Sequence, residues 1–303
     1  MERIDADARD RAAQFVWRTG SLVDQRRMAH HTGTGTGAEV RAAVLAHRTR
    51  DGGFAFALEP DVKGPDPQPL AAMTALELLD EAGALDAATG AGVCDWLAGR
   101  TAPDGGVPDL LDTIAAYPHP PWVQAPPQDR GGLLTTARAA GYLLRNGIEH
   151  PWLEGATAFC RARIDAIEAT HPYEVFSIGA FLGAAPDRNW ANGAAGRIGE
   201  LVRTTGLVLL DPANPEGAAP PAGYAPGEHH LACDFAPEPD SVGAAWFSAD
   251  EMRTALDFRA AEQEADGGWP IHYRRWHSGI ELQARPGFTI AALRTLRAWE
   301  GKA

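Results

Sequence analysis

One tripeptide with the chemistry of a proton donor occurs in two loops of this sequence. Glu59-Pro60-Asp61 and Glu238-Pro239-Asp240 each precede a segment that we expect to be helical. Carboxyl groups held together in a Pro-stiffened loop repel one another, and burial adds to this effect, so that the pKa of one of them rises. Such a carboxyl can act as a general acid near neutral pH. All four carboxyls are therefore candidate catalytic groups, with Asp61 or Asp240 as the expected acid.

Further acidic residues flank the two tripeptides. Asp66 follows the first and Asp234 precedes the second, and both are added to the catalytic candidates. Oxygen ligands of this kind could also bind a divalent cation such as magnesium. A structural alternative is that Asp61 and Asp66 in the first loop, and Asp240 or Ser241 in the second, cap the helices that follow. If instead both loops point into one cavity, they form a paired acidic site.

A third group combines His229 and His230 with Cys233 and Asp234. Cysteine and histidine are the usual ligands of zinc. The spacing is irregular, however, and no second Cys-x-x-Cys or His-x-x-x-His pair completes a site. The sequence therefore does not favour zinc, and the cofactor stays unknown, with magnesium compatible with the acidic loops.

Aromatic and basic residues could line a binding cavity. Aromatic faces attract cations and carbocations, although core packing is the more frequent role of any single aromatic residue. Basic groups beside them could bind an anion, or could belong to a solvated surface turn. The candidate substrate-binding residues are the aromatic Phe56, Trp122, Tyr173 and Trp276, and the basic His272, Arg274 and Arg275.

A second tripeptide indicates how the chain is built. Asp51-Gly52-Gly53, Asp104-Gly105-Gly106 and Asp266-Gly267-Gly268 each follow a helical-looking segment and precede a hydrophobic residue. The first two copies are 53 residues apart, and the second and third are 162 apart, close to three times that interval. A turn that recurs at a fixed interval is typical of stacked supersecondary units. We expect its Gly to end the preceding helix in the left-handed conformation and its Asp to accept hydrogen bonds from the turn.

The long segments between the Gly- and Pro-rich stretches have the composition of helices, and we expect ten to twelve of them. They cover about residues 6–30, 38–50, 70–82, 88–100, 133–145, 190–203, 248–264 and 288–299, with two more that begin near His150 and His171. Stacked hairpins bury apolar faces that one hairpin cannot bury alone, and a closed ring needs no capping repeats. We therefore predict an all-α fold, a single α/α barrel (toroid) domain over residues 1–303 with five to six helical hairpins.

The third copy of the turn resembles a family motif. Gln263, Gly267 and Trp269 match the glutamine–tryptophan repeat of squalene and oxidosqualene cyclases, in which a helix ends in Gln, a short spacer, Gly, any residue and Trp. The whole chain resembles the terpenoid cyclase and protein prenyltransferase α/α-toroid superfamily. The resemblance implies an enzyme that acts on a hydrophobic, isoprenoid-type small molecule in a central barrel cavity.

The catalytic motifs of that superfamily do not occur in this sequence. It has neither the Asp-x-Asp-Asp motif of cyclases that protonate an alkene nor the Asp-Asp-x-x-Asp motif of those that ionise a diphosphate, and residues 229–234 do not match the prenyltransferase zinc site. A fold does not imply a function. Two alternatives therefore stay open: a carbohydrate-active α/α-barrel hydrolase or lyase, and a non-catalytic ligand-binding or scaffold toroid.

Composition limits the partners and the location. The 303 residues carry a formal net charge of −13, which argues against nucleic-acid binding because that requires a basic surface. No run of about 18 apolar residues occurs, so we expect no membrane span. The three cysteines form no Cys-x-x-Cys pair, which favours a reduced, cytoplasmic location. The sequence does not indicate an oligomeric state.

Overall fold

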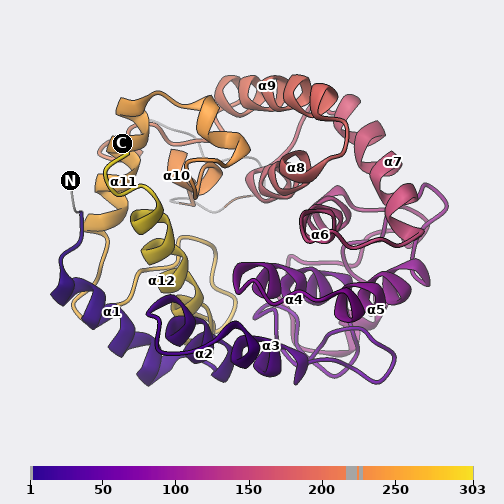
Figure 1. The fold of residues 1–303 in the computed structure, drawn as a ribbon, viewed down its shortest axis with the longest axis horizontal. Helices are drawn as coiled ribbons and strands as arrows, with labels where there is room; N and C mark the ends of the chain where they lie inside the picture. Colours follow the sequence, from indigo (N-terminus) through magenta and orange to yellow (C-terminus); the bar gives the residue numbers. More distant parts are fainter. Residues whose placement is uncertain (1–2, 216–223, 225–227, 303) are drawn as a thin grey trace. The chain divides into compact units, whose positions relative to one another are not determined.

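The computed structural model describes residues 3–215, 224 and 228–302. These residues form twelve α-helices and short 3-10 segments, and their only β-structure is two isolated bridges (Figure 1). The prediction of an all-α fold with ten to twelve helices is therefore confirmed. Among the described residues, no helix combines the length and the hydropathy needed to cross a bilayer.

The chain divides into two compact units, Gly35–Ala194 (unit 2) and Met1–Thr34 with Ala195–Ala303 (unit 1). Unit 2 contains α3 (Gly37–Leu45), α4 (Pro69–Glu81), α5 (Ala87–Ala98), η1 (Asp112–Ala116), α6 (Leu133–Arg145), α7 (Trp152–Asp165) and α8 (Pro172–Ala184). Unit 1 contains α1 (Ala6–Thr19), α2 (Leu22–His31), α10 (Ala232–Phe235), η3 (Val242–Trp246), α11 (Ala249–Ala261) and α12 (Ile280–Ala298). Helix α9 (Arg188–Thr204) begins in unit 2 and ends in unit 1.

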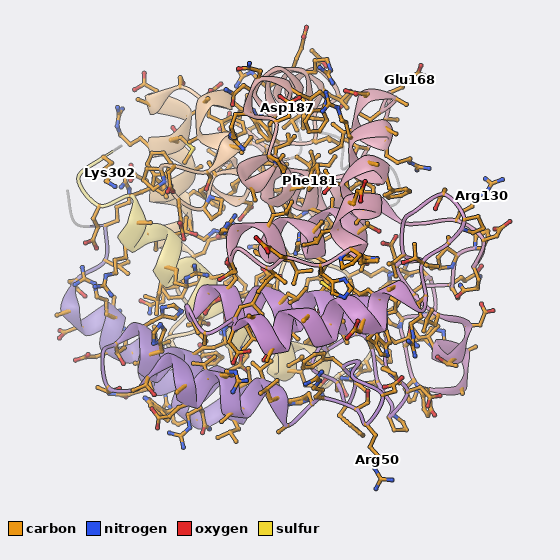
Figure 2. The ribbon with its side chains drawn as sticks, turned by 45° about the vertical axis from the view of Figure 1, so that its right-hand side comes forward. Arg50, Arg130, Glu168, Phe181, Asp187 and Lys302 are labelled. Carbon is orange, nitrogen blue, oxygen red and sulfur yellow. The ribbon has the colours of Figure 1, made fainter. Side chains whose placement is uncertain are left out.

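In unit 2, three helices lie side by side, because α6 packs against α4 and against α8 (Figure 1). The approach of α6 to α8 depends on Gly141, where an added Cβ would lie 2.6 Å from the carbonyl carbon of Ala180. Phe181 of α8 is fully buried, whereas charged side chains such as Arg50 and Arg130 extend from the surface of the unit (Figure 2). The apolar core of unit 2 therefore fixes the positions of α4, α6 and α8.

The three Asp-Gly-Gly turns share one local structure. Gly52, Gly105 and Gly267 have φ values of +97°, +92° and +95°. The Asp side chain of each turn accepts a hydrogen bond from the N–H of the second Gly, at 3.4, 3.1 and 3.0 Å. The predictions of a left-handed Gly and of an accepting Asp are both confirmed.

The turns do not, however, end the helices before them. Helices α3, α5 and α11 end at Leu45, Ala98 and Ala261, six or seven residues before the left-handed Gly. Each turn is instead closed by its own backbone hydrogen bonds, such as that from Ala102 N–H to Gly106 O at 2.8 Å. The prediction that Gly terminates the helix was therefore wrong, because the positive φ serves a separate tight turn.

Each turn packs on another helix of its unit in the same register. A Cβ added to the second Gly would lie 2.4–2.7 Å from an aromatic ring on that helix. A Cβ added to the first Gly would approach the carbonyl oxygen four residues before that ring, at 3.5, 3.3 and 2.3 Å. The rings belong to Trp96 on α5, Phe159 on α7 and Phe15 on α1. The third turn therefore uses the N-terminal helix as the first two turns use α5 and α7.

Side chains of the resemblance motif hold the third turn in place. Gln263 Nε2 donates to Ala8 O of α1 at 2.8 Å and to Gly267 O at 3.0 Å. Trp269 is fully buried, and its indole N–H donates to Arg259 O at 2.6 Å. Gln263 and Trp269 thus join α11, the turn and α1, which agrees with the structural role that the motif suggests.

Several helices have bounds that differ from those expected from the sequence. The segment 6–30 forms two helices, because Ser21 and Asp24 make a capping box that starts α2 after the break at Gly20. Helix α12 begins at Ile280 instead of near residue 288, and Pro286 lies inside it. Proline usually ends a helix because it lacks an N–H donor, so the sequence pattern placed this start about two turns too late. The helices expected at 38–50 and 248–264 also end earlier, at Leu45 and Ala261.

The fit between the second turn and α7 can be tested with two Gly→Ala variants. Gly106→Ala places a methyl group 2.5 Å from the Phe159 ring, and we expect a loss of about 1–3 kcal/mol in the free energy of unfolding. Gly155→Ala in the exposed face of α7 meets no atom within 4 Å, and we expect it to be neutral or to stabilise the protein by about 0.5–1 kcal/mol. Urea unfolding measures both; equal effects would contradict this packing.

Candidate functional site

The first acidic tripeptide lies in the Glu59 loop, defined as residues 54–68 between the first turn and α4. Hydrogen bonds from Phe56 N–H to Gly64 O (2.9 Å) and from Val62 N–H to Glu59 O (3.0 Å) close the loop on itself. Phe56 and Ala57 have φ values of +58° and +55°. Two successive non-Gly residues in the left-handed region are uncommon and costly, and such strain often accompanies functional sites. The loop is thus held in a defined and strained conformation.

Glu59 is a strongly perturbed carboxyl in this loop. Its side chain is half-buried, and its Oε2 lies 3.0 Å from the Thr74 hydroxyl of α4. The pKa of Glu59 is raised to about 7, chiefly by burial and also by the negative charge of Asp61, while hydrogen bonds from Thr74 and from the Asp61 backbone oppose these effects. A carboxyl with this pKa can both release and accept a proton near neutral pH.

The Thr74 hydroxyl can serve either protonation state of Glu59. Thr74 Oγ1 lies 3.0 Å from Glu59 Oε2 and 3.1 Å from Leu70 O. A hydroxyl has one hydrogen, so it cannot donate to both oxygens. Thr74 donates to the carboxylate when Glu59 is ionised; when Glu59 is protonated, the carboxyl can donate to Thr74 while Thr74 donates to Leu70. The contact is therefore compatible with proton exchange at Glu59.

Beyond Thr74, a charged network joins α4, α6 and α8. Arg138 of α6 donates from Nη1 to Glu77 Oε2 of α4 at 3.2 Å and from Nε to Ser177 Oγ of α8 at 3.2 Å. Its Nη2 lies 3.5 Å from Tyr173 O. Burial lowers the pKa of Arg138, but the charge of Glu77, its hydrogen bond and the further effects of Tyr142 and Glu59 together raise it overall. The guanidinium thus stays charged and interacts electrostatically with Glu59.

Asp61 and Lys63 complete the charged part of the Glu59 loop. Both are half-buried. Burial lowers the pKa of Lys63, while the charges of Asp61 and Glu59 act in the opposite direction. Two carboxyls and an amine are therefore within electrostatic reach of one another in a single loop.

Other polar residues of the loop have structural contacts. Asp66 Oδ2 accepts a hydrogen bond from the Tyr117 hydroxyl at 3.0 Å. Gln68 is buried and binds Thr113 Oγ1 at 2.8 Å and Leu111 N–H at 2.7 Å. Helix α4 begins after Gln68 with no side-chain cap. The alternative in which Asp61 and Asp66 cap this helix is therefore wrong, because Asp66 anchors Tyr117 instead.

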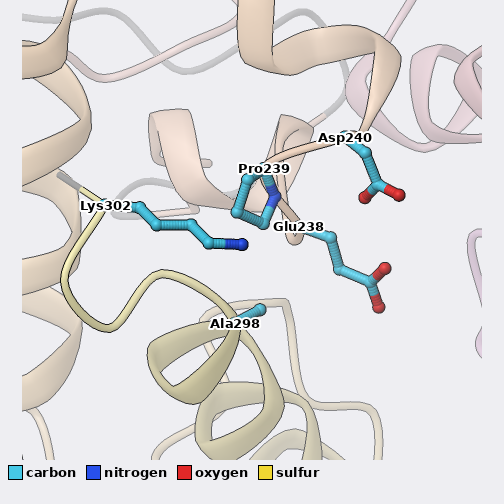
Figure 3. A pocket seen from close by; sticks show the side chains of 5 residues that line it. All are labelled: Glu238, Pro239, Asp240, Ala298 and Lys302. Atoms are coloured by element: carbon cyan, nitrogen blue, oxygen red, sulfur yellow. The ribbon is translucent and has the colours of Figure 1, made fainter.

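The second acidic tripeptide lies in unit 1 and is more exposed. Glu238 and Asp240 are exposed and line a shallow pocket of about 390 Å³ with Pro239, Ala298 and Lys302 (Figure 3). Glu238 forms an ion pair with Arg294 at 3.2 Å. Segment η3 begins after Ser241 with no side-chain cap, so neither Asp240 nor Ser241 caps it as expected; the Ser241 hydroxyl instead accepts from Glu238 N–H at 3.0 Å. Because the two tripeptides lie in different units, a paired acidic site stays a prediction.

In the third sequence group, Asp234 forms an ion pair with the buried Arg259. Asp234 Oδ1 accepts from Arg259 at 2.7 Å, and its Oδ2 accepts from Leu231 N–H at the start of α10. Burial raises the pKa of Cys233 to about 12, so its thiol stays protonated. Within residues 3–215, 224 and 228–302, no three His, Cys, Asp or Glu side chains are placed to bind one metal ion. We therefore derive no step through magnesium or zinc.

The aromatic and basic candidates lie in several places. Tyr173 packs edge-on against Phe176 at 5.9 Å, in the helix that Arg138 contacts. Phe56 and Trp122 are 50 % and 44 % exposed, and Trp276 packs on His277. In unit 1, His272 Nε2 lies 2.7 Å from Glu262, Arg275 pairs with Glu281 at 3.3 Å, and Arg274 is exposed. Of the aromatic candidates in unit 2, only Tyr173 is linked by these contacts to the network around Glu59, because its carbonyl oxygen lies 3.5 Å from Arg138 Nη2.

The network members that lie in helices, Thr74, Glu77 and Arg138, were not among the residues predicted from the sequence. Thr74 and Glu77 are spaced by three residues, which places them on one face of α4. Arg138 interrupts an apolar stretch of α6, and the structure places it against Glu77. The available signal was the presence of these polar residues within largely apolar helical segments.

Comparison with known proteins gives a fold and no function. No family model matches this sequence, and no curated protein matches it. A solved structure described as the crystal structure of a protein from Actinoplanes is similar over 97 % of this chain and 98 % of that one, with a TM-score of 0.58 and 15 % identity. At this identity the likeness concerns the fold alone.

The raised pKa of Glu59 predicts a pH-dependent stability. Between pH 4.5 and about 7 the folded protein retains a proton that the unfolded chain releases, so this group's contribution to stability falls as pH rises and is constant above about 7. Glu59→Gln cannot ionise. We expect its stability relative to the wild type to increase by on the order of 2 kcal/mol from about pH 5 to about pH 8. Chemical unfolding at both pH values tests this. Glu238→Gln, at an exposed site, should show no such trend, and a flat difference for Glu59→Gln would contradict the burial argument.

Proposed function

We propose that the chain is an α/α toroid of the terpenoid cyclase and prenyltransferase type. The common register of the three turns supports this, because the third turn uses α1 in the way that the first two use α5 and α7. In a closed ring, the N-terminal helix would pack on the last turn, where each earlier turn packs on a helix that follows it in the sequence. The contacts of Gln263 and Trp269 with α1 and α11 agree with it.

We further propose that the protein is an enzyme in which Glu59 transfers a proton to or from a hydrophobic, isoprenoid-type small molecule. The observation that carries this proposal is the half-buried Glu59 carboxyl. It is hydrogen-bonded to Thr74 and interacts electrostatically with Asp61 and with the Glu77–Arg138 ion pair. Glu59 is preferred over Asp61 because its hydrogen bond to Thr74 reaches α4, and over Asp240 because Asp240 is exposed. Positioned proton transfer typically accelerates a reaction about a hundredfold or more.

The pKa of Glu59 limits the proton transfers that it can catalyse. An acid with a pKa of about 7 is far too weak to protonate an isolated alkene, but it is matched to proton transfer at oxygen or nitrogen at neutral pH. As a carboxylate, it can also remove a proton next to a cationic or carbonyl carbon. We therefore propose a substrate that carries a heteroatom, which agrees with the absence of an Asp-x-Asp-Asp motif from this sequence.

Aromatic side chains beside the charged groups support a hydrophobic substrate. Phe56 is half-exposed in the same loop as Glu59, although its apolar ring would be more stable if it were buried. Tyr173 and Phe176 are only half-buried and belong to α8, whose Ser177 binds Arg138. An isoprenoid chain could cover these apolar surfaces.

Native mass spectrometry and product extraction test this function. We expect farnesol or farnesal to remain bound to the protein and maltohexaose not to bind. Glu59→Gln should retain the ligand but lose about a hundredfold or more of any turnover, which is read by gas chromatography of extracts. Glu238→Gln serves as the matched control and should keep both properties. Binding of the oligosaccharide alone would favour the carbohydrate alternative, and binding of neither probe would favour a scaffold.

A further inference from the structure

Arg138 of α6 is held less tightly than an arginine that only joins two elements. Its Nη1 donates to a single oxygen of Glu77 at 3.2 Å, and its Nη2 lies 3.5 Å from Tyr173 O, which is longer than an ordinary hydrogen bond. By contrast, Arg203 binds both carboxylate oxygens of Glu251, at 2.8 and 3.0 Å. A purely structural guanidinium gains most from that two-oxygen arrangement, so the contacts of Arg138 leave room for another role.

The guanidinium of Arg138 can bind one more oxygen atom. It carries five N–H donors, and the described residues supply three acceptors for them: Glu77 Oε2, Ser177 Oγ and Tyr173 O. The side chain of Arg138 is 14 % exposed, and that of its partner Glu77 is 41 % exposed. The group is therefore mostly buried but still accessible, and a ligand could bind it without displacing a protein partner.

Arg138 lies close to the groups that surround the Glu59 carboxyl. Thr74, which is hydrogen-bonded to Glu59, and Glu77, which is bonded to Arg138, are three residues apart on α4. Side chains with this spacing are neighbours on one helix face, with Cβ atoms about 5–6 Å apart. A group that can accept a proton and a cation that can donate hydrogen bonds thus contact adjacent positions of the same helix.

We propose that Arg138 binds the carbonyl oxygen of a ketone or aldehyde substrate and stabilises the enolate that forms when Glu59 removes a proton from the neighbouring carbon. The inference rests on the proposed function and deepens it, since it names the substrate class and a further catalytic residue. The C–H bond breaks as the Glu59 carboxylate takes the proton, its electron pair forms a C=C bond, and the carbonyl π pair moves to oxygen. Return of the proton to this carbon, or to one conjugated with it, restores the carbonyl, so the step needs no oxidant or reductant.

The residues around Arg138 have distinct parts in this step. A guanidinium stays charged and presents N–H groups in a fixed plane, which suits an oxygen atom on which negative charge develops. Glu77 and Ser177 contact the guanidinium and are assigned as positioning residues. The half-buried rings of Tyr173 and Phe176 belong to the same helix as Ser177 and supply the apolar surface for the rest of the substrate.

Deuterium exchange next to the carbonyl group tests this step. We would incubate the whole protein with geranylacetone, an isoprenoid ketone, in deuterated buffer near neutral pH and measure deuterium uptake by mass spectrometry of the extracted ketone. We expect exchange to be faster than in buffer alone by about a hundredfold or more. Arg138→Lys keeps the charge but loses the planar set of donors, and should slow exchange by about a hundredfold. Arg145→Lys, two turns further along α6 in a residue paired with Asp80, is the matched control and should leave the rate unchanged.

A binding measurement distinguishes this role from a structural one without relying on an Arg138 variant. The 4-nitrophenolate ion resembles an enolate because it is planar and carries its charge on oxygen, and its absorbance reports binding. Glu77→Gln removes a carboxylate that competes for Arg138, so we expect it to bind 4-nitrophenolate about two- to fivefold more tightly than the wild type. If Arg138 served only to pair with Glu77, this variant would not bind the ion more tightly, and that result would overturn the inference.

The exchange outcomes separate this inference from the proposed function. Loss of exchange in both Glu59→Gln and Arg138→Lys supports both. Loss in Glu59→Gln alone, or an equal loss in Arg145→Lys, overturns the assignment of Arg138 while the proposed function stands. If geranylacetone binds in native mass spectrometry without exchange, the enolate step is overturned and hydrophobic binding is retained. Acetone that exchanges as fast as geranylacetone supports the carbonyl site and contradicts a hydrophobic substrate, and absence of both binding and exchange contradicts both proposals.

Discussion

The structure depends on the absence of side chains at two positions of each repeat turn. The first Gly takes a left-handed conformation, and the second lies so close to an aromatic ring that a Cβ would collide with it. The backbone of the turn can contact the aromatic ring only because the glycine has no side chain. Close packing of this kind tolerates little added volume. This local constraint fixes the register of α5, α7 and α1 on their turns.

A second constraint follows from charge within packed helices. Helices α4, α6 and α8 place Glu77, Arg138 and Ser177 against one another, and Glu59 joins this group from its loop through Thr74. Charges removed from water are costly unless partners compensate them. Arg138 has such partners. At Glu59, burial and the charges of Asp61 and Glu77 outweigh the hydrogen bonds that the carboxyl accepts, so it meets the cost by holding its proton. The network is thus stable in the protonation state that also makes it chemically useful.

Much of the fold could be predicted from the sequence, because helices and tight turns follow local rules. The range 133–145 was predicted as observed, and the left-handed Gly and accepting Asp of each turn were expected from residue type. The errors have physical causes: Pro286 is tolerated inside α12, and the turns stand apart from the helix ends. The site was only half predictable. Glu59 and Asp61 could be found as a repeated tripeptide, but Arg138 and Glu77 come together only through packing of helices that are distant in sequence.

The contact between the third turn and α1 joins residues about 250 positions apart. Helix α1 is synthesised before the third turn, so this contact cannot form until about 250 further residues have been made. Bringing such distant segments together has an entropic cost, and contacts of this range slow folding. The apolar face of α1, which includes Phe15 and Val16, stays without its final partner during that time.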